Sequence, residues 1–89
     1  METRIAVMGI IVEKVSSVED LNALLHDYRA YIVGRMGIPY RDKGISIMSI
    51  AIDAPQDIIS SLAGRVGKLE GISVKTAYSS KIYGDEDEK

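Results

Sequence analysis

The sequence predicts an α+β fold with four strands and two helices in the order β-α-β-β-α-β. Four stretches are rich in Ile and Val, and two others repeat apolar residues at helical spacing. This order is the ferredoxin-like plan, a sandwich in which a four-stranded antiparallel sheet carries both helices on one face. The 89 residues have room for one such domain. We therefore expect a single domain over residues 1–80 and an acidic, disordered tail over residues 81–89.

The first strand is expected at residues 4–12, because nearly every position is apolar. Residues 16–19, Ser-Ser-Val-Glu, match a capping box, in which a Ser side chain accepts a hydrogen bond from a helix amide. The first helix should run from Val18 to about Tyr28. Its apolar face would carry Val18, Leu21, Leu24, Leu25 and Tyr28.

The second strand is expected at residues 31–36, interrupted at Gly34. Residues 37–44 should form a turn region in which Pro39 marks the end of strand pairing. The third strand follows at residues 44–53.

The second helix should begin near Pro55, which suits a first helical turn, and should end at Gly71 with a positive φ. Residues 72–78 form the last expected strand, and the chain should leave the fold from Ser79 onward.

The first and third strands are apolar on both faces, although helices can cover only one face of the sheet. An uncovered apolar face usually marks an interface. We therefore expect a homodimer, tetramer or other homo-oligomer in which sheet packs on sheet or edge pairs with edge. The expected interface residues are Val7, Gly9, Ile11, Gly34, Ile45 and Ile47, where the two glycines would allow another backbone to approach.

Composition narrows the functional classes. Without Cys, the chain has no disulfides, no thiolate chemistry and no Cys-based metal site. It shows no secretory signal and no apolar run long enough to span a bilayer, so we expect a cytoplasmic protein with no membrane contact. The net charge of −2 owes much to residues 85–88, an acidic run that is either a solvated end or an arm that mimics an anion. The near-neutral remainder lacks the basic footprint of a dedicated DNA-binding protein.

Three strings, RIAVMGIIVEK, LHDYRAYIVGRMGIPY and GISIMSIAIDAP, resemble the family of iron-only hydrogenase system regulators over residues 4–79. A more distant resemblance is to the C-terminal regulatory domain of the nickel-responsive regulator, which has an ACT-like ferredoxin fold. These resemblances imply an ACT-like fold, oligomerisation and a role in regulation, transcriptional regulation included. They do not imply a metal, because the positions matching the nickel ligands are Met36, Ile38 and Gly44, none of which suits nickel.

ACT-type domains bind small effectors near the first strand–helix loop and at a subunit interface. The resemblance therefore implies an effector site at Glu13, Lys14, Ser16 and Ser17, where a helix N-terminus offers amides and hydroxyls to an anion. A capping box explains the same two serines, and Glu19 would compete with an anion. Both interpretations stay open at this point.

A second candidate surface, for an anion or a partner, comprises Arg35, Tyr40, Arg41 and Lys43. Phosphate or RNA could bind there, but the two central strands carry no aromatic residue on which a base would stack. A charged hairpin tip that protects a sheet edge is the favoured interpretation, and direct nucleic-acid binding is disfavoured.

The sequence contains no recognisable catalytic motif, so we expect neither an enzyme nor a cofactor. His26 is the only histidine, and it should lie solvated on the flank of the first helix. The alternative is a ligand or pH-sensing role at an interface. The leading hypothesis is a regulatory domain that self-associates and acts through a partner protein or a small effector at the subunit interface. The alternative is a structural adaptor without a ligand.

Overall fold

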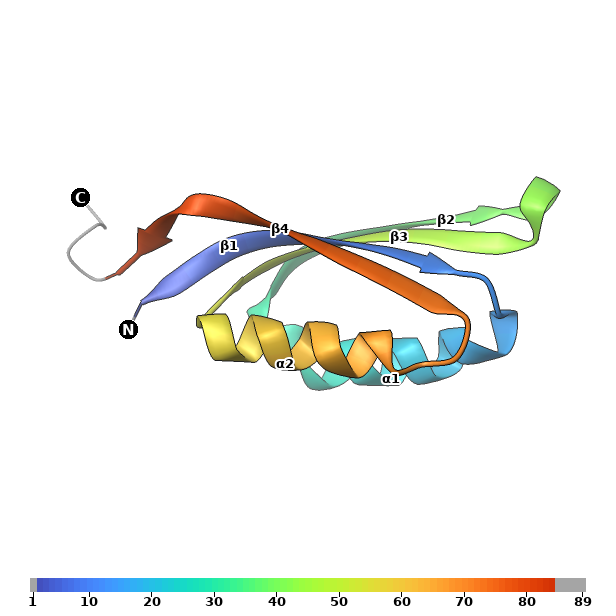
Figure 1. The fold of residues 1–89 in the computed structure, drawn as a ribbon, viewed down its shortest axis with the longest axis horizontal. Coiled ribbons are helices and arrows are strands. Elements are labelled where there is room, and N and C mark those ends of the chain that lie inside the picture. The colour runs from blue at the N-terminus through green and yellow to red at the C-terminus, as the bar shows by residue number, and fades with distance from the viewer. Residues whose placement is uncertain (1, 85–89) are drawn as a thin grey trace.

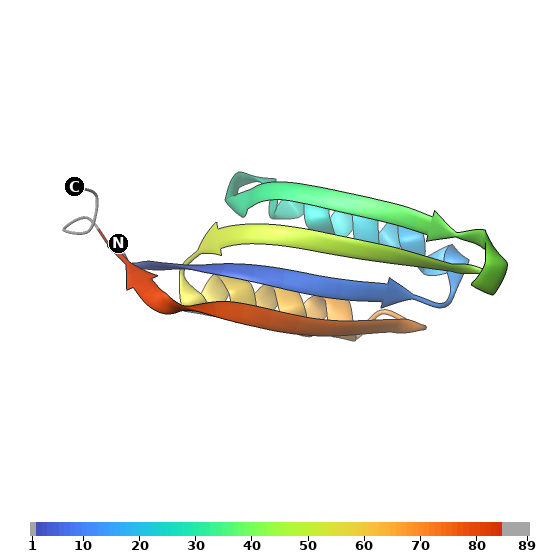
Figure 2. The same cartoon turned by 90° about the horizontal axis from the view of Figure 1, so that it is seen from above.

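The computed structural model describes residues 2–84 and shows the expected order of elements (Figure 1). These elements are β1 (Thr3–Val12), α1 (Val18–Asp27), β2 (Ile32–Tyr40), β3 (Ile45–Ala54), α2 (Gln56–Gly67) and β4 (Ile72–Tyr83). The strands form one antiparallel sheet in the order β2-β3-β1-β4. Both helices lie on the same face of this sheet, and no described element covers the other face (Figures 1 and 2). The predicted ferredoxin-like, ACT-like fold class is thereby confirmed.

The core lies between the sheet and the two helices. Alternate residues of β1 and β3 point toward the helices and are buried, while their neighbours point to the opposite face. The apolar stripe of each helix packs against these strands. The fully buried side chains include Met8, Ile10, Val12, Ile50 and Ile52 from the sheet, and Leu21, Leu25, Ile59, Leu62 and Val66 from the helices.

Strand β2 is longer than the sequence predicted, and the turn after it is shorter. Its ladder with β3 continues through Gly37 and Pro39 to Tyr40, so the prediction that pairing ends at Pro39 was wrong. The proline is tolerated because β2 is an edge strand, where one side of the backbone has no ladder partner. The turn consists of the short 3₁₀ helix Arg41–Lys43 and Gly44, whose φ is 66°. The interruption expected at Gly34 appears as a register shift between Ile32 and Gly34.

Strand β4 is also longer than predicted. The chain does not leave the sheet at Ser79, because Arg4 pairs with Ile82 and Thr3 with Tyr83 beyond an irregularity in the β1–β4 ladder. The expected boundary between residues 80 and 81 therefore lies within a strand. The acidic run at residues 85–88, which carried the prediction of a disordered tail, lies outside the described residues.

The second helix ends earlier than predicted. Helix α2 stops at Gly67, and its C-cap residue Lys68 keeps a right-handed helical conformation. Gly71 does have the predicted positive φ, of 71°, but it serves the turn into β4 instead of the helix end.

Candidate functional site

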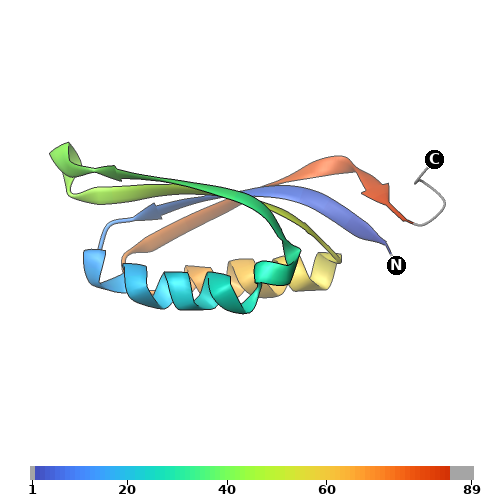
Figure 3. The same ribbon diagram turned by 180° about the vertical axis from the view of Figure 1, so that it is seen from behind.

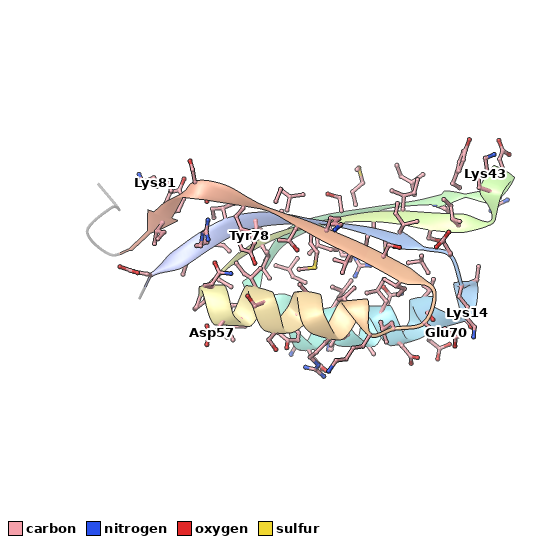
Figure 4. All side chains as sticks on the ribbon, in the orientation of Figure 1. Lys14, Lys43, Asp57, Glu70, Tyr78 and Lys81 are labelled. Atoms are coloured by element: carbon pink, nitrogen blue, oxygen red, sulfur yellow. The ribbon has the colours of Figure 1, made fainter. Side chains whose placement is uncertain are left out.

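The sheet face opposite the helices is apolar and exposed (Figure 4). We call it the open face. The ladder register places on it Ile5, Val7, Gly9, Ile11, Gly34, Met36, Ile38, Tyr40, Ile45, Ile47, Ser49 and Ala51, with Asp53 at the end of β3 and Ser73, Lys75 and Ala77 on the edge strand β4. Six of these are large apolar side chains at least 36% exposed: Val7, Ile11, Met36, Ile38, Tyr40 and Ile47. A patch of this kind usually marks an interaction surface.

The large residues of the open face are cross-strand neighbours. Ile47 of β3 pairs with Ile11 of β1 on one side and with Ile38 of β2 on the other. Side chains directly opposite each other in a ladder lie about 5 Å apart, so the patch is continuous across the three strands.

The structure brings all six residues of the sequence-predicted interface onto this one face. Ile38 and Tyr40 also belong to this surface but were not predicted there, because Gly37 and Pro39 suggested a turn, and Met36, the last residue of the predicted strand, was not assigned to the interface. The alternation of Gly34, Met36, Ile38 and Tyr40 at a spacing of two residues was the signal that could have found them. Met36 and Ile38 had been considered only as positions matching metal ligands.

Two glycines leave space on the open face. A Cβ atom built on Gly9 would lie 3.9 Å from the carbonyl oxygen of Lys75, which is ordinary contact, and one on Gly34 would meet nothing within 4 Å. Gly34 lines a shallow hollow of about 280 Å³ together with Val7, Met36 and Ala51. Packing within the chain therefore does not require glycine at either position.

The loop before α1 is held by the turn before β4. Ser17 Oγ donates a 2.7 Å hydrogen bond to the carbonyl oxygen of Glu70, and Lys14 Nζ lies 2.7 Å from Glu70 Oε2. Figure 4 shows Lys14 and Glu70 beside each other at this end of the molecule. The predicted capping box was wrong, because Ser17 is the N-cap residue but its side chain bonds to Glu70 instead of a helix amide. Of the predicted effector-site residues, Glu13, Lys14 and Ser16 are exposed, and Ser17 is buried.

The structure separates the members of the predicted anion surface. Arg35 pairs with the buried Ile50 and therefore lies on the helix-facing side of β2, where it donates a 2.9 Å hydrogen bond to Asn22 Oδ1. Tyr40 lies on the open face. Arg41 and Lys43 lie in the turn at the tip of the hairpin.

His26 is exposed on α1, as the sequence suggested. It lines a hollow of about 250 Å³ between α1 and β2, together with Arg29 and Arg35. Among residues 2–84, no three His, Cys, Asp or Glu side chains are grouped so that they could hold a metal ion. None of the helices in this range is long and apolar enough to cross a membrane.

Comparisons with known proteins agree with this architecture. The uncharacterized protein TM1266 from Thermotoga maritima has a similar solved structure, with a TM-score of 0.82 and 28% sequence identity; the match covers 85% of this chain and 96% of that one. A formyltetrahydrofolate deformylase from Pseudomonas putida KT2440 matches with a TM-score of 0.59 and 15% identity over 82% of this chain and 28% of that one, which supports the fold alone. No curated protein matches the chain.

One family model matches residues 4–76, which run from β1 into the first half of β4. Its description, "Iron-only hydrogenase system regulator, putative", names a regulator and not an enzyme. The chain therefore belongs to the TM1266-like family, the family that its sequence resembles.

Proposed function

We propose that this chain is a regulatory domain whose working form is a homo-oligomer joined through the open face. It acts through a partner protein or through a small effector held at the subunit interface. The observation that carries the proposal is the gathering of six large, exposed apolar side chains on the sheet face opposite the helices. Membership of a family described as regulators supports a regulatory role.

The size of the open face suits an interface between copies. The molecule measures 46 × 20 × 18 Å along its principal axes, and the sheet extends along the longest of them (Figure 2). A face of this size is comparable with the roughly 800 Å² per partner that stable protein interfaces bury. Covering it with the same face of a second copy would remove apolar surface from water on both partners, at about 25 cal/mol per Å².

Packing between sheet faces is favoured over pairing between sheet edges. An edge contact through β2 would satisfy backbone groups of that strand but would leave Val7, Ile11 and Ile47 exposed. Packing of two faces would bury all three.

The test compares two substitutions of equal chemistry. Ile47→Lys places a charge in the middle of the open face, whereas Val15→Lys changes an exposed apolar residue, 67% accessible, in the loop before α1. We expect the wild type and Val15→Lys to sediment as multimers at micromolar concentration and Ile47→Lys to sediment as a folded monomer. A wild-type monomer under these conditions would refute the proposal.

A second candidate function is an adaptor that binds no small molecule. The observation in its favour is that Ser17 and Lys14, two residues of the predicted effector site, are already bonded to Glu70. A ligand that binds only the folded protein raises its melting temperature. A thermal-shift panel of nucleotides, amino acids and divalent metal ions therefore separates the two functions, since the adaptor should show no shift.

A further inference from the structure

The groove between α1 and β2 differs chemically from the open face. In Figure 3, α1 lies beneath the sheet on the β2 side. The hollow of about 250 Å³ between them is lined by Asn22, Leu25, His26, Arg29, Ile32 and Arg35. Three of these side chains are basic and none is acidic. In a chain whose net charge is −2, this makes a local positive site.

The hollow has an apolar floor. Leu25 is only 1% exposed, and the partly buried Ile32 packs against the same core. Arg35 reaches the hollow from the helix-facing side of the edge strand, and His26 and Arg29 reach it from the end of α1 and the turn that follows. Three basic groups from separate positions along the chain thus surround one apolar floor.

Both arginines are held by neutral acceptors. Arg35 Nη2 donates to the amide oxygen of Asn22 at 2.9 Å, and Arg29 Nη1 donates to the main-chain oxygen of His26 at 3.0 Å. These bonds orient the guanidinium groups without neutralising them. The nearby carboxylate of Asp27 lines a different hollow, between the two helices, with Arg65. The forked donors that remain on each guanidinium suit a carboxylate or a phosphate.

A second hollow, of about 190 Å³, lies on the other side of Asn22 and Arg35. Most of its lining is apolar and includes Val18, Pro39 and Met48. The absence of a side chain at Gly37 leaves room in this hollow. A Cβ atom built there would lie 3.8 Å from Met48 Cγ, which is ordinary van der Waals contact. Arg35 therefore lies between a basic hollow and an apolar one.

We propose that this groove binds an amphipathic organic anion. Its carboxylate or phosphate head contacts His26, Arg29 and Arg35, and its short hydrocarbon chain occupies the hollow beside Met48. The site lies on the helix-facing side of the sheet, so it does not depend on the self-association proposed for the open face.

The test titrates the ¹⁵N-labelled protein with hexanoate, hexyl phosphate, acetate and hexan-1-ol, and follows the backbone amide resonances. We expect saturable shifts in α1 and β2 with one or both of the six-carbon anions, and the tighter of the two identifies the head group. Each methylene buried should improve affinity about fourfold, so hexanoate or hexyl phosphate should bind at least tenfold more tightly than acetate. Hexan-1-ol, which has the chain without the charge, should not saturate.

Two variants with a matched control locate the site. Arg35→Gln should weaken anion binding about tenfold or more, because it removes a charge-assisted hydrogen bond. Arg41→Gln removes the same charge from the turn of the same hairpin and should have no effect. Gly37→Val should reduce the preference for the six-carbon anion over acetate, because it fills the apolar hollow. The amide spectrum of each variant shows whether it is folded.

The proposal is overturned if neither six-carbon anion binds saturably, or if Arg35→Gln and the wild type bind equally well. Sedimentation of the same samples keeps this result separate from the proposed function. A multimer that binds no anion would remove the groove site and leave the open-face interface standing. A monomer that binds the anion would remove the open-face interface and leave the groove site standing.

Discussion

The hydroxyl of Ser17 donates a hydrogen bond to the carbonyl oxygen of Glu70 and joins the loop before α1 to the turn before β4. The same two segments are joined by the main-chain hydrogen bond from Glu13 N to Gly71 O, also 2.7 Å long, and by the ion pair of Lys14 with Glu70. Three contacts between segments more than 50 residues apart give this loop a structural role.

Replacing Ser17 with alanine should destabilise the fold. The substitution removes the only side-chain donor that Glu70 O has among residues 2–84, in a place where Ser17 is 7% exposed. Losing this part-buried hydrogen bond should cost about 0.5–1.5 kcal/mol of unfolding free energy. Ser16→Ala, at the exposed neighbouring position, should change it by less than about 0.5 kcal/mol. Urea denaturation of both variants measures the difference, and equal effects would contradict the structural role.

Gly71→Ala should cost more than Gly44→Ala, although both glycines have a positive φ, of 71° and 66°. The left-handed conformation costs a non-glycine residue about 1–2 kcal/mol at either position. At Gly71 the new Cβ would also lie 2.5 Å from Lys14 Cβ and 3.0 Å from Lys14 N, whereas at Gly44 it meets nothing within 4 Å. This overpacking should add about 1–3 kcal/mol, measurable by thermal or urea unfolding. Similar losses of stability in the two variants would show that the loop carrying Lys14 shifts without cost.

Tyr28 should make the stability of the fold pH-dependent in the alkaline range. The Ser61 hydroxyl, 3.0 Å away, and the Arg65 guanidinium, 3.1 Å away, lower the pKa of Tyr28 below its ordinary value of 10.0. Between the folded pKa and 10.0 the unfolded chain therefore binds more protons than the folded one, and the contribution of Tyr28 grows as the pH rises. It is complete above 10.0 and is lost as the pH falls through the folded pKa.

The measurement compares the urea midpoints of the wild type and Tyr28→Phe between pH 7 and about pH 10.5. The comparison with Tyr28→Phe cancels the titration of other groups, and the gap between the two proteins should widen with pH. A constant or narrowing gap would show that the phenolate is not favoured in the folded state.

Gly9→Ala should act in opposite directions on the single chain and on the assembly. Alanine fits the space above Gly9 and lowers the entropy cost of ordering the strand, which favours the monomer by about 0.5–1 kcal/mol. In the oligomer, the added methyl group would push away a closely packed partner. Urea unfolding of Gly9→Ala in the Ile47→Lys background measures the gain in stability of the single chain. Sedimentation of Gly9→Ala alone measures the loss of association. An unchanged dissociation constant would mean that the partner does not approach closely at Gly9.

The order of elements and most of the core could be predicted because periodicity is a local property of the chain. Apolar residues alternate in β1 and β3, and they recur at helical spacing around Leu21 in α1 and around Leu62 in α2. Both patterns are visible without knowing the fold. Local turn signals misled the prediction where pairing overrode them. Gly37 and Pro39 remain in β2 because its ladder with β3 and its edge position tolerate both. Ser17 resembled a helix cap in the sequence but bonds to a segment 53 residues away.

By itself, the sequence determined the fold class, the two-sided apolar strands and six residues of the open face. Only the tertiary structure decided which residues form the basic groove. Proximity in the chain had grouped Arg35 with Tyr40, Arg41 and Lys43. The register shift between Ile32 and Gly34 sets Arg35 on the side that faces α1, and strand alternation then places Tyr40, five residues on, on the opposite side. Side-chain periodicity is encoded locally, whereas the register of a ladder and the helix that lies across it depend on contacts between residues far apart in the chain.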